Sequence, residues 1–284
     1  MMRAMGIDSQ QLKNYQRDGF LVMESFVDAA TCDLIRGHAE EMVRAFDPNG
    51  LVSIFSTHEQ SRLSNEYFLE SGDKIRYFFE EQAFLPDGTL KQAREQSINK
   101  IGHALHDLDP VFDRFSRSPQ IRQIVADLCI EQPLLLQSMY IFKQPNIGGE
   151  VTCHQDSTFL YTEPIDIAGF WFALEDATIE NGCLWAIPGG HQQGLKSRWV
   201  RTSQGGMQFH VFDSNPWSDE KLQPLEVRKG TLILLHGLLP HRSLENKSPK
   251  SRPAYTLHII GGHCVFPKDN WLQRSPSMPL RGFE

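Results

Sequence analysis

The stretch GEVTCHQDSTFL, at residues 149–160, contains a histidine and an aspartate two positions apart. The stretch otherwise alternates like a half-buried strand, and on a strand residues i and i+2 project from the same face. We therefore expect His154 and Asp156 to point together while Gln155 points away, a geometry that suits two ligands of one metal ion. In a chain with 11 histidines such a pair also arises easily by chance, so it is weak support on its own.

A second segment, GTLILLHGLLPHRSLENKSPKSRPAYTLHII, raises the odds of a metal site. It predicts an apolar strand, a loop that carries histidines, and an arginine that opens the next strand. One of its histidines would complete a set of two histidines and one carboxylate, which favours non-haem Fe(II) and leaves three coordination positions open. From the residues alone the third ligand stays undecided, and His236 could instead be structural. The candidates are His236, His241, His258 and His263.

Three open positions would admit a chelating 2-oxo acid and dioxygen. Such a co-substrate also carries a second carboxylate at the end remote from the metal. This group is best held by the two parallel N–H donors of a guanidinium and by a neighbouring hydroxyl. Arg252 and Ser243 are the natural pair for this role.

The elements that must position these residues begin with a predicted helix, strand and helix. A helix starts near the capping residues at 8–9 and stops at Gly19, an apolar run follows at 20–23, and Asp28 is a plausible N-cap of a second helix. Residues 47–66 read as an irregular surface loop. Residues 1–132 are thus predicted to be mainly helical and irregular.

Two further segments belong to this first part of the chain. A hairpin-like excursion is expected around Pro86, Asp87 and Gly88. Residues 97–129 read as two or three helices punctuated by Pro110 and Pro119.

Beyond residue 133 the sequence has a pattern typical of a β-sandwich or barrel. Short apolar runs are separated by Gly, Pro and Asn clusters, without intervening helices. We predict a single domain over residues 1–284, mainly β with α: a jelly-roll (double-stranded β-helix, cupin-like) core at about 133–265, with the N-terminal helices packed outside. The runs that carry this prediction are LLLQSMYIFK, IAGFWFALED, GCLWAIPG, LEVRKGTLILLH and AYTLHIIGGH.

Composition narrows the class of protein. No apolar stretch approaches the roughly 18 residues of a membrane span, and the N-terminus lacks a signal-type apolar block. A formal net charge of −7 argues against a sequence-independent nucleic-acid binder. The 5 cysteines are scattered and never spaced as CxxC, so they predict neither a disulfide framework nor a thiolate zinc site. We expect a cytoplasmic monomer with no nucleic-acid or membrane partner.

Several long motifs resemble those of the phytanoyl-CoA dioxygenase family of Fe(II)- and 2-oxoglutarate-dependent oxygenases, and the likeness covers almost the whole chain. They are YQRDGFLV, SGDKIRYFFE, SINKIGHALHDLDPVF, QSMYIFKQPNIGGEV, HQDSTFLYTEP, EDATIENGCLWAIPGGH, HGLLPHRSLEN and SRPAYTLH.

The resemblance implies specific roles for residues. It selects His241 over His236 as the third ligand and places the family's distal arginine at Arg252. It implies Fe(II), 2-oxoglutarate and O2 as cofactor and co-substrates, with ascorbate as an auxiliary. The iron ligands would be His154, Asp156 and His241, and the 2-oxoglutarate pocket would be lined by Lys100, Met139, Trp171, Ser243 and Arg252.

The expected reaction converts 2-oxoglutarate to succinate and CO2 while a small organic or acyl substrate is hydroxylated. Asp156 favours this over halogenation, because related halogenases have a small residue there. Lys196, Arg198 and Arg201 could meet an anionic group such as a phosphate of an acyl-CoA, or form a solvated loop. The chain ends in RGFE rather than a peroxisomal SKL. Two alternatives are a 2-oxoglutarate-binding sensor and a cupin-like metalloenzyme without a co-substrate.

Overall fold

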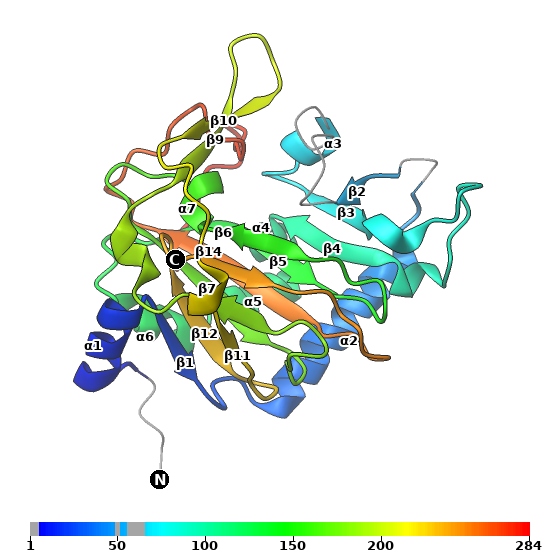
Figure 1. Ribbon diagram of the computed structural model, residues 1–284, viewed down its shortest axis with the longest axis horizontal. Helices are drawn as coiled ribbons and strands as arrows, with labels where there is room; N and C mark the ends of the chain where they lie inside the picture. The colour runs from blue at the N-terminus through cyan, green and yellow to red at the C-terminus, as the bar shows by residue number, and fades with distance from the viewer. Residues whose placement is uncertain (1–5, 49–51, 56–65) are drawn as a thin grey trace.

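Two β-sheets, almost entirely antiparallel, face each other, and helices cover the outer face of the larger one (Figure 1). This computed structural model describes residues 6–48, 52–55 and 66–284. The loop expected at 47–66 therefore lies largely outside the described residues. Its described part contains the short strand β2 (Ile54–Phe55).

Capping residues and prolines begin the helices as the sequence predicts. Asp8 forms a capping box with Gln11, Gly19 ends the first helix at φ 81°, and Asp28 caps the second. Pro110 and Pro119 each open a helix. Among the described residues, no helix combines the length and apolarity that crossing a membrane requires. The α-helices are α1 (Ser9–Asp18), α2 (Ala29–Ala45), α3 (Glu66–Leu69), α4 (Leu105–Leu108), α5 (Pro110–Ser116), α6 (Pro119–Asp127) and α7 (Asp156–Phe159).

The larger sheet has eight strands in the order β1-β12-β7-β14-β5-β4-β3-β2, and only the β2–β3 pair is parallel. Its central strand β14 pairs with both β5 and β7 along its whole length. The bounds of its strands other than β2 are β1 (Phe20–Met23), β3 (Ile75–Glu80), β4 (Ile98–His103), β5 (Leu134–Ile141), β7 (Ile167–Ala173), β12 (Leu232–His236) and β14 (Ala254–Ile260).

The smaller sheet has four strands in the order β11-β8-β13-β6. A separate hairpin of two strands projects from the upper side of the molecule in Figure 1. The small-sheet strands are β6 (Val151–His154), β8 (Leu184–Ala186), β11 (Gln223–Leu225) and β13 (His241–Ser243), and the hairpin strands are β9 (Ser197–Arg201) and β10 (Met207–Val211). Single 3₁₀ turns lie at Glu81–Ala83, Arg94–Gln96, Gly190–Gln193 and Asp219–Lys221.

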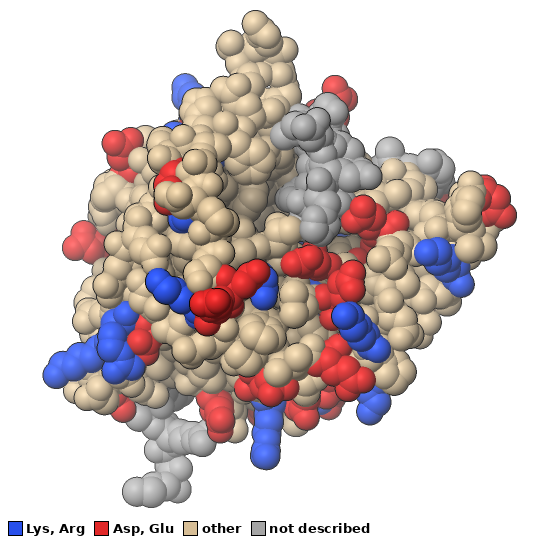
Figure 2. Space-filling model, in the orientation of Figure 1, with Lys and Arg blue, Asp and Glu red and all other residues tan. Residues whose placement is uncertain are grey.

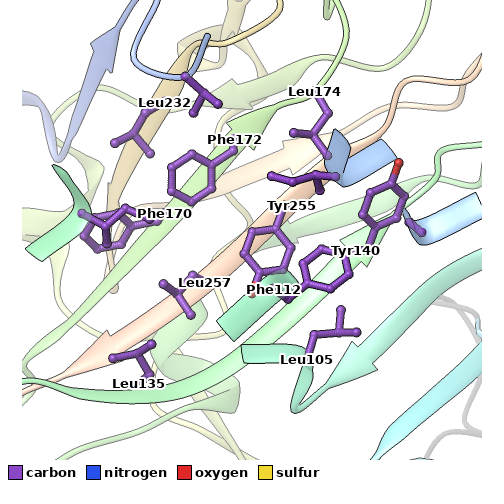
Figure 3. Packing of buried hydrophobic residues seen from close by; sticks show 14 of the residues in the cluster. Leu105, Phe112, Leu135, Tyr140, Phe170, Phe172, Leu174, Leu232, Tyr255 and Leu257 are labelled. Atoms are coloured by element: carbon purple, nitrogen blue, oxygen red, sulfur yellow. The ribbon is translucent and has the colours of Figure 1, made fainter. Parts of the chain in front are cut away.

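Alternation along the strands separates a helix-facing core from the space between the sheets. Phe170 and Phe172 of β7 pack with α2, α5 and α6, whereas Trp171 and Ala173 face the smaller sheet. On the helix side the Phe112 ring stacks on Tyr255 at 5.0 Å between centroids (Figure 3). Both faces of β7 and β14 are buried, which explains the continuous apolar sequence of β7 and the mostly apolar sequence of β14.

The jelly-roll core and the outer helices confirm the predicted fold class. The opening helix, strand and helix are also confirmed, and Leu85 N donates to Thr89 O in the expected turn around Gly88. Two expectations are wrong. Residues 98–103 form β4 rather than a helix, and with β3 they extend the larger sheet into the part of the chain expected to be helical and irregular.

The second correction concerns the HxD pair. Strand β6 ends at His154, and Asp156 is the first residue of α7. The two side chains therefore do not share a strand face as residues i and i+2.

Candidate active site

His154, Asp156 and His241 converge between the two sheets. One ligand atom from each lies within 4.8 Å of the others. His241 of β13 is the cross-strand partner of His154 in β6, which brings their ring centroids to 4.4 Å. The Nε2 atoms of His154 and His241 lie 3.7 and 3.8 Å from Asp156 Oδ1. The three potential ligands thus face one point.

Hydrogen bonds orient both histidine rings. Nδ1 of His154 lies 2.8 Å from Thr152 O, and Nδ1 of His241 lies 3.0 Å from Leu239 O. Because a carbonyl oxygen only accepts, each Nδ1 must carry the hydrogen and donate it. Each Nε2 then faces Asp156 and is the nitrogen left to bind a metal, whose positive charge would take the place of a proton there.

A glycine on the larger sheet makes room for the carboxylate. A Cβ at Gly169 in β7 would lie 2.9 Å from Asp156 Oδ2. Any side chain there would displace Asp156, so this strand position needs glycine for a close approach rather than for an unusual φ.

A third histidine contacts the other carboxylate oxygen. Nε2 of His258 in β14 lies 3.3 Å from Asp156 Oδ2, although that oxygen has no partner of good hydrogen-bond geometry in the described part of the chain. Burial by itself would raise the pKa of Asp156, but His258, His241 and His154 outweigh it and hold this pKa well below its usual range. Asp156 is therefore a carboxylate at neutral pH.

Arg252 lies in the same cavity, two residues before β14. It is only 2% exposed, and its guanidinium lies over the Trp171 ring at 5.1 Å. Nη2 donates weakly to Ser243 Oγ at 3.4 Å, whereas Nε and Nη1 have no hydrogen-bond partner among the described residues. Burial lowers the pKa of Arg252 to about 10, which still leaves it charged. A buried cation with unused donors is a binding element for an anion.

A polar network lies behind Arg252. Lys143 Nζ donates to Gly149 O at 2.5 Å, and burial followed by the Arg252 charge lowers the pKa of Lys143 to about 7. Glu80 accepts from Asn99 Nδ2 at 2.8 Å and from Gly149 N at 3.1 Å, while burial raises its pKa. Lys143 and Glu80 thus bond to other groups of the chain. We infer that this network holds the wall of the cavity beside Arg252 in place.

The other three residues implied by the family resemblance also line this cavity, whose volume is about 170 Å³. Lys100 projects from β4 with Nζ 3.1 Å from the centre of the Phe55 ring. Met139 lies on β5 and Trp171 on β7, and both pair with Thr256 of β14. All eight predicted site residues therefore border one space.

Two of the histidines left open as ligands lie elsewhere. Nδ1 of His236 accepts from Leu238 N at 3.1 Å, and its ring packs 4.9 Å from His191. Burial, then His191, lowers the pKa of His236 to about 4. His263 belongs to a separate cluster with Asp166 and Cys264.

The basic segment at residues 196–201, most of which is β9, is neither a solvated loop nor a set of free cations. Lys196 pairs with Asp213 at 3.0 Å, and Arg198 pairs with Asp269 at 2.8 Å. Arg201 donates to the carbonyls of Leu69 and Trp271. These contacts tie the hairpin to the rest of the fold.

His258 is the residue of the site that sequence reasoning missed. It was one of four candidate ligands, with no sign that it would contact the carboxylate. A signal was present, because residues 252, 254, 256 and 258 alternate with the helix-facing Tyr255 and Leu257. Because alternate residues of a strand point to the same face, counting in steps of two from Arg252 would have placed His258 on the face that lines the cavity.

Comparison with known proteins identifies the family. The phytanoyl-CoA dioxygenase (PhyH) family model matches residues 15–254. The chain is 48% identical over 283 residues to phytanoyl-CoA dioxygenase 1 of Oryza sativa subsp. japonica, covering 99% of each chain. It is 45% identical over 283 residues to phytanoyl-CoA dioxygenase domain-containing protein 1 of Bos taurus, covering 96% of this chain and 97% of that one.

A solved structure shows the same fold at low identity. EctD from S. alaskensis, crystallised with 2-oxoglutarate and 5-hydroxyectoine, superposes with a TM-score of 0.64 at 18% identity, covering 97% of this chain and 86% of that one. The motif resemblance is thus confirmed by the family model, by close relatives and by the fold. The chain belongs to the phytanoyl-CoA dioxygenase family.

Proposed function

We propose that this chain is an Fe(II)- and 2-oxoglutarate-dependent dioxygenase that hydroxylates a small organic or acyl substrate. The observation that carries the proposal is one cavity that holds both a facial set of two histidines and a carboxylate and a buried arginine with unused donors. Neither feature alone would distinguish this activity from other metal chemistry. Together they match a metal and a dicarboxylate co-substrate.

The donor set fits ferrous iron. Two imidazoles, each with its Nδ1 bonded to a backbone carbonyl, and one ionised carboxylate would hold the ion between them. When bound, iron activates O2 so that one oxygen atom enters succinate, as CO2 leaves 2-oxoglutarate, and the other enters the product hydroxyl.

The residues of the chain bind and orient. Arg252 and Ser243 would hold the far carboxylate of 2-oxoglutarate, and the Trp171 ring covers the guanidinium and limits access of water to it. His258 would restrain the Asp156 oxygen that does not face the two histidines. Positioning of this kind, rather than proton transfer, is the contribution that the geometry supports.

The cavity wall supports a substrate whose reacting part is apolar. Phe68, Phe159, Leu160 and Trp271 line the cavity that contains the candidate metal ligands, and the Phe159 ring lies 5.7 Å from the His154 ring. The cations at residues 196–201 are committed to internal partners, so they give no support to an acyl-CoA phosphate at that place. On the face in Figure 2, Lys and Arg side chains lie among Asp and Glu, which supports a small-molecule substrate rather than a nucleic acid.

The test is succinate formation from 2-oxoglutarate with Fe(II) under air. The wild type should turn over 2-oxoglutarate, at least slowly, even without the primary substrate. Asp156→Ala and His241→Ala should not, whereas His210→Ala, at an exposed histidine on β10, should match the wild type. Equal rates in all four proteins would refute the proposal.

The same assay separates the alternatives. A sensor would bind 2-oxoglutarate tightly, seen as a thermal shift, and form no succinate with any substrate of a broad panel. A cupin-like metalloenzyme would keep its metal-dependent activity in Arg252→Leu and show no thermal shift with 2-oxoglutarate.

A further inference from the structure

A second group of metal-ligating side chains lies outside the cavity. Asp166 ends the segment that leads from α7 to β7, and His263 and Cys264 lie in the turn that follows β14. One ligand atom from each lies within 4.8 Å of the others, and Cys264 Sγ is 3.5 Å from a ring nitrogen, Nε2, of His263. Asp166 is about 100 positions from His263 and Cys264 in the chain, so the fold brings it to them.

Backbone hydrogen bonds fix the two segments against each other. Glu163 N donates to Val265 O at 3.0 Å, Val265 N donates to Glu163 O at 2.9 Å, and Gly261 N donates to Asp166 O at 3.2 Å. The three side chains are therefore held in mutual reach by main-chain contacts on both sides, which lowers the entropy cost of gathering them around an ion.

Gly261 forms the floor of the group. A Cβ built there would lie 2.2 Å from Asp166 Oδ2 and 2.7 Å from His263 Cε1. The Asp166 carboxylate and the His263 imidazole thus both pack against the backbone of Gly261, where a larger residue would push them away.

The electrostatics favour a cation. Burial raises the pKa of Asp166, and Glu131 raises it further against the effect of His263. Burial and then the Asp166 charge raise the pKa of the Cys264 thiol. Burial thus disfavours negative charge at both residues, and the positive charge of a bound cation would offset that cost.

We propose that Asp166, His263 and Cys264 form a second metal site, selective for a thiophilic divalent ion such as Zn²⁺. A thiolate, an imidazole and a carboxylate are all zinc ligands, and the thiolate disfavours Mg²⁺ and Ca²⁺. On binding, the Cys264 thiol loses its proton to solvent and its sulfur bonds to the ion, with no change in oxidation state. The fourth position is open to water, because His263 is exposed and the other two residues are partly exposed.

This site differs from the triad in its chemistry. The triad has nitrogen and oxygen ligands only, whereas the second site contains sulfur. An ion there would join the segment that follows Asp156 and α7 to the segment that follows His258 and β14. The scattered cysteines gave no indication of it, because Asp166 lies far from His263 and Cys264 in the sequence.

Cobalt(II) distinguishes the two sites. A bond between Co²⁺ and a cysteine thiolate produces strong charge-transfer absorption in the near ultraviolet, which imidazole and carboxylate ligands do not produce. We expect this band when Co²⁺ is added to the reduced, metal-stripped full-length chain, and its complete loss in Cys264→Ser. Absence of the band in the wild type, or its survival in Cys264→Ser, would overturn the proposal.

Matched variants make the assignment specific. Cys153 is also partly exposed and precedes His154, and Cys129 is exposed; neither belongs to the group of three ligands, so Cys153→Ser and Cys129→Ser should keep the band. Asp156→Ala should keep it too, because the triad is a separate site. Loss of the band in Cys153→Ser would assign the sulfur to the triad and refute the second site.

A second variant guards against misfolding. His263→Gln should weaken Co²⁺ binding, measured from the same band, by more than about tenfold, because loss of even a hydrogen-bond partner of a ligand costs 10- to 100-fold. Unchanged affinity in a folded His263→Gln protein would contradict the three-residue site.

Discussion

Asp107 and Asp156 are both buried carboxylates with a histidine beside them, and in both the neighbouring groups hold the pKa well below its usual range. Burial would raise the pKa at each site, but histidine and arginine partners outweigh it at Asp107 and histidines do so at Asp156. Judged by pKa alone, either could be the functional carboxylate.

Their hydrogen bonds differ. Oδ1 of Asp107 accepts from Arg117 at 2.7 Å and from Arg281 at 2.9 Å, and Oδ2 accepts from Arg274 at 2.9 Å. These bonds attach the C-terminal segment to α4 and α5. Both oxygens of Asp107 therefore have partners, and Asp107 does not line the cavity that contains Asp156.

The surroundings of Asp156 are incomplete. Four buried polar atoms have no hydrogen-bond partner in the described part of the chain, and the three residues that carry them border one cavity. These atoms are Asp156 Oδ2, His258 Nδ1, Arg252 Nε and Arg252 Nη1. Buried polar groups are rarely left without partners unless a ligand or water supplies them. Unused donors and acceptors around a cavity, rather than a shifted pKa, thus separate the candidate site from the structural ion cluster.

The largest effect is expected at Asp107. Asp107→Asn would leave three arginines facing a neutral amide, and breaking a buried ion pair from one side costs about 3 to 5 kcal/mol. The free energy of unfolding, measured with urea, should fall by that amount. Asp113→Asn is the matched control, because Asp113 also pairs with Arg117 and Arg281 but is 39% exposed at its side chain, so its loss should be under about 1 kcal/mol. Similar losses in both variants would show that Asp107 is not the centre of the cluster.

At the incomplete site the corresponding change should affect binding more than folding. Arg252→Met keeps the length of the side chain and removes the fork, so KM for 2-oxoglutarate should rise about 100-fold, equivalent to about 3 kcal/mol. Arg252→Lys keeps the charge without the fork, so its KM should lie between those of the wild type and Arg252→Met. Arg122→Met, at an exposed position of α6, should leave KM unchanged. An Arg252→Met protein with wild-type KM would mean that 2-oxoglutarate is held elsewhere.

The sequence was sufficient to predict the fold where pattern and burial agree. The runs that became β5, β7, β12 and β14 are mostly apolar because helices cover one side of the sheet and the second sheet covers the other. The candidate triad also followed from residue types and family motifs, since the ligand set depends on few positions.

Strand β4 could not be found in the same way. All its residues are buried, yet Asn99, Lys100 and His103 are polar because they line the cavity or join the network behind it. The need for polar groups in the site overrode the apolar pattern that marks a strand. The same holds for Asp156, whose place at the start of α7 depends on tertiary contacts such as Gly169 rather than on local alternation.

His236, like Asp107, lies outside the candidate site and has its hydrogen-bond partner, because its Nδ1 accepts from Leu238 N. Its folded pKa is about 4, and the unfolded value is about 6.5. Above about pH 6.5 neither state is protonated; as the pH falls toward about 4, the unfolded state binds a proton first, so stability is lost and the loss reaches about 2 kcal/mol at pH 5.

The matching variant is His236→Asn, which can still accept from Leu238 N but does not titrate. Urea unfolding at pH 7.5 and pH 5 should show a smaller loss of stability in His236→Asn than in the wild type, by about 2 kcal/mol. His210→Asn, at an exposed site, should follow the wild type. Parallel pH dependence in all three proteins would exclude His236 as the titrating group.

The smallest effect is expected at His258, where the structure offers a contact to Asp156 at 3.3 Å rather than a complete hydrogen bond. His258→Phe keeps a ring but removes the donor, so Asp156 should be less well oriented and the affinity for Fe(II) should fall about tenfold, the low end for partners of metal ligands. His258→Gln restores an N–H donor and should recover part of the loss, which a packing role alone would not explain. Thr256→Val lies on the same face of β14, but its hydroxyl donates to Met139 O, so Fe(II) affinity should not change. If His258→Phe bound Fe(II) as tightly as the wild type, the two histidines that face Oδ1 would orient Asp156 without help, and the unpaired Oδ2 would be free for a substrate.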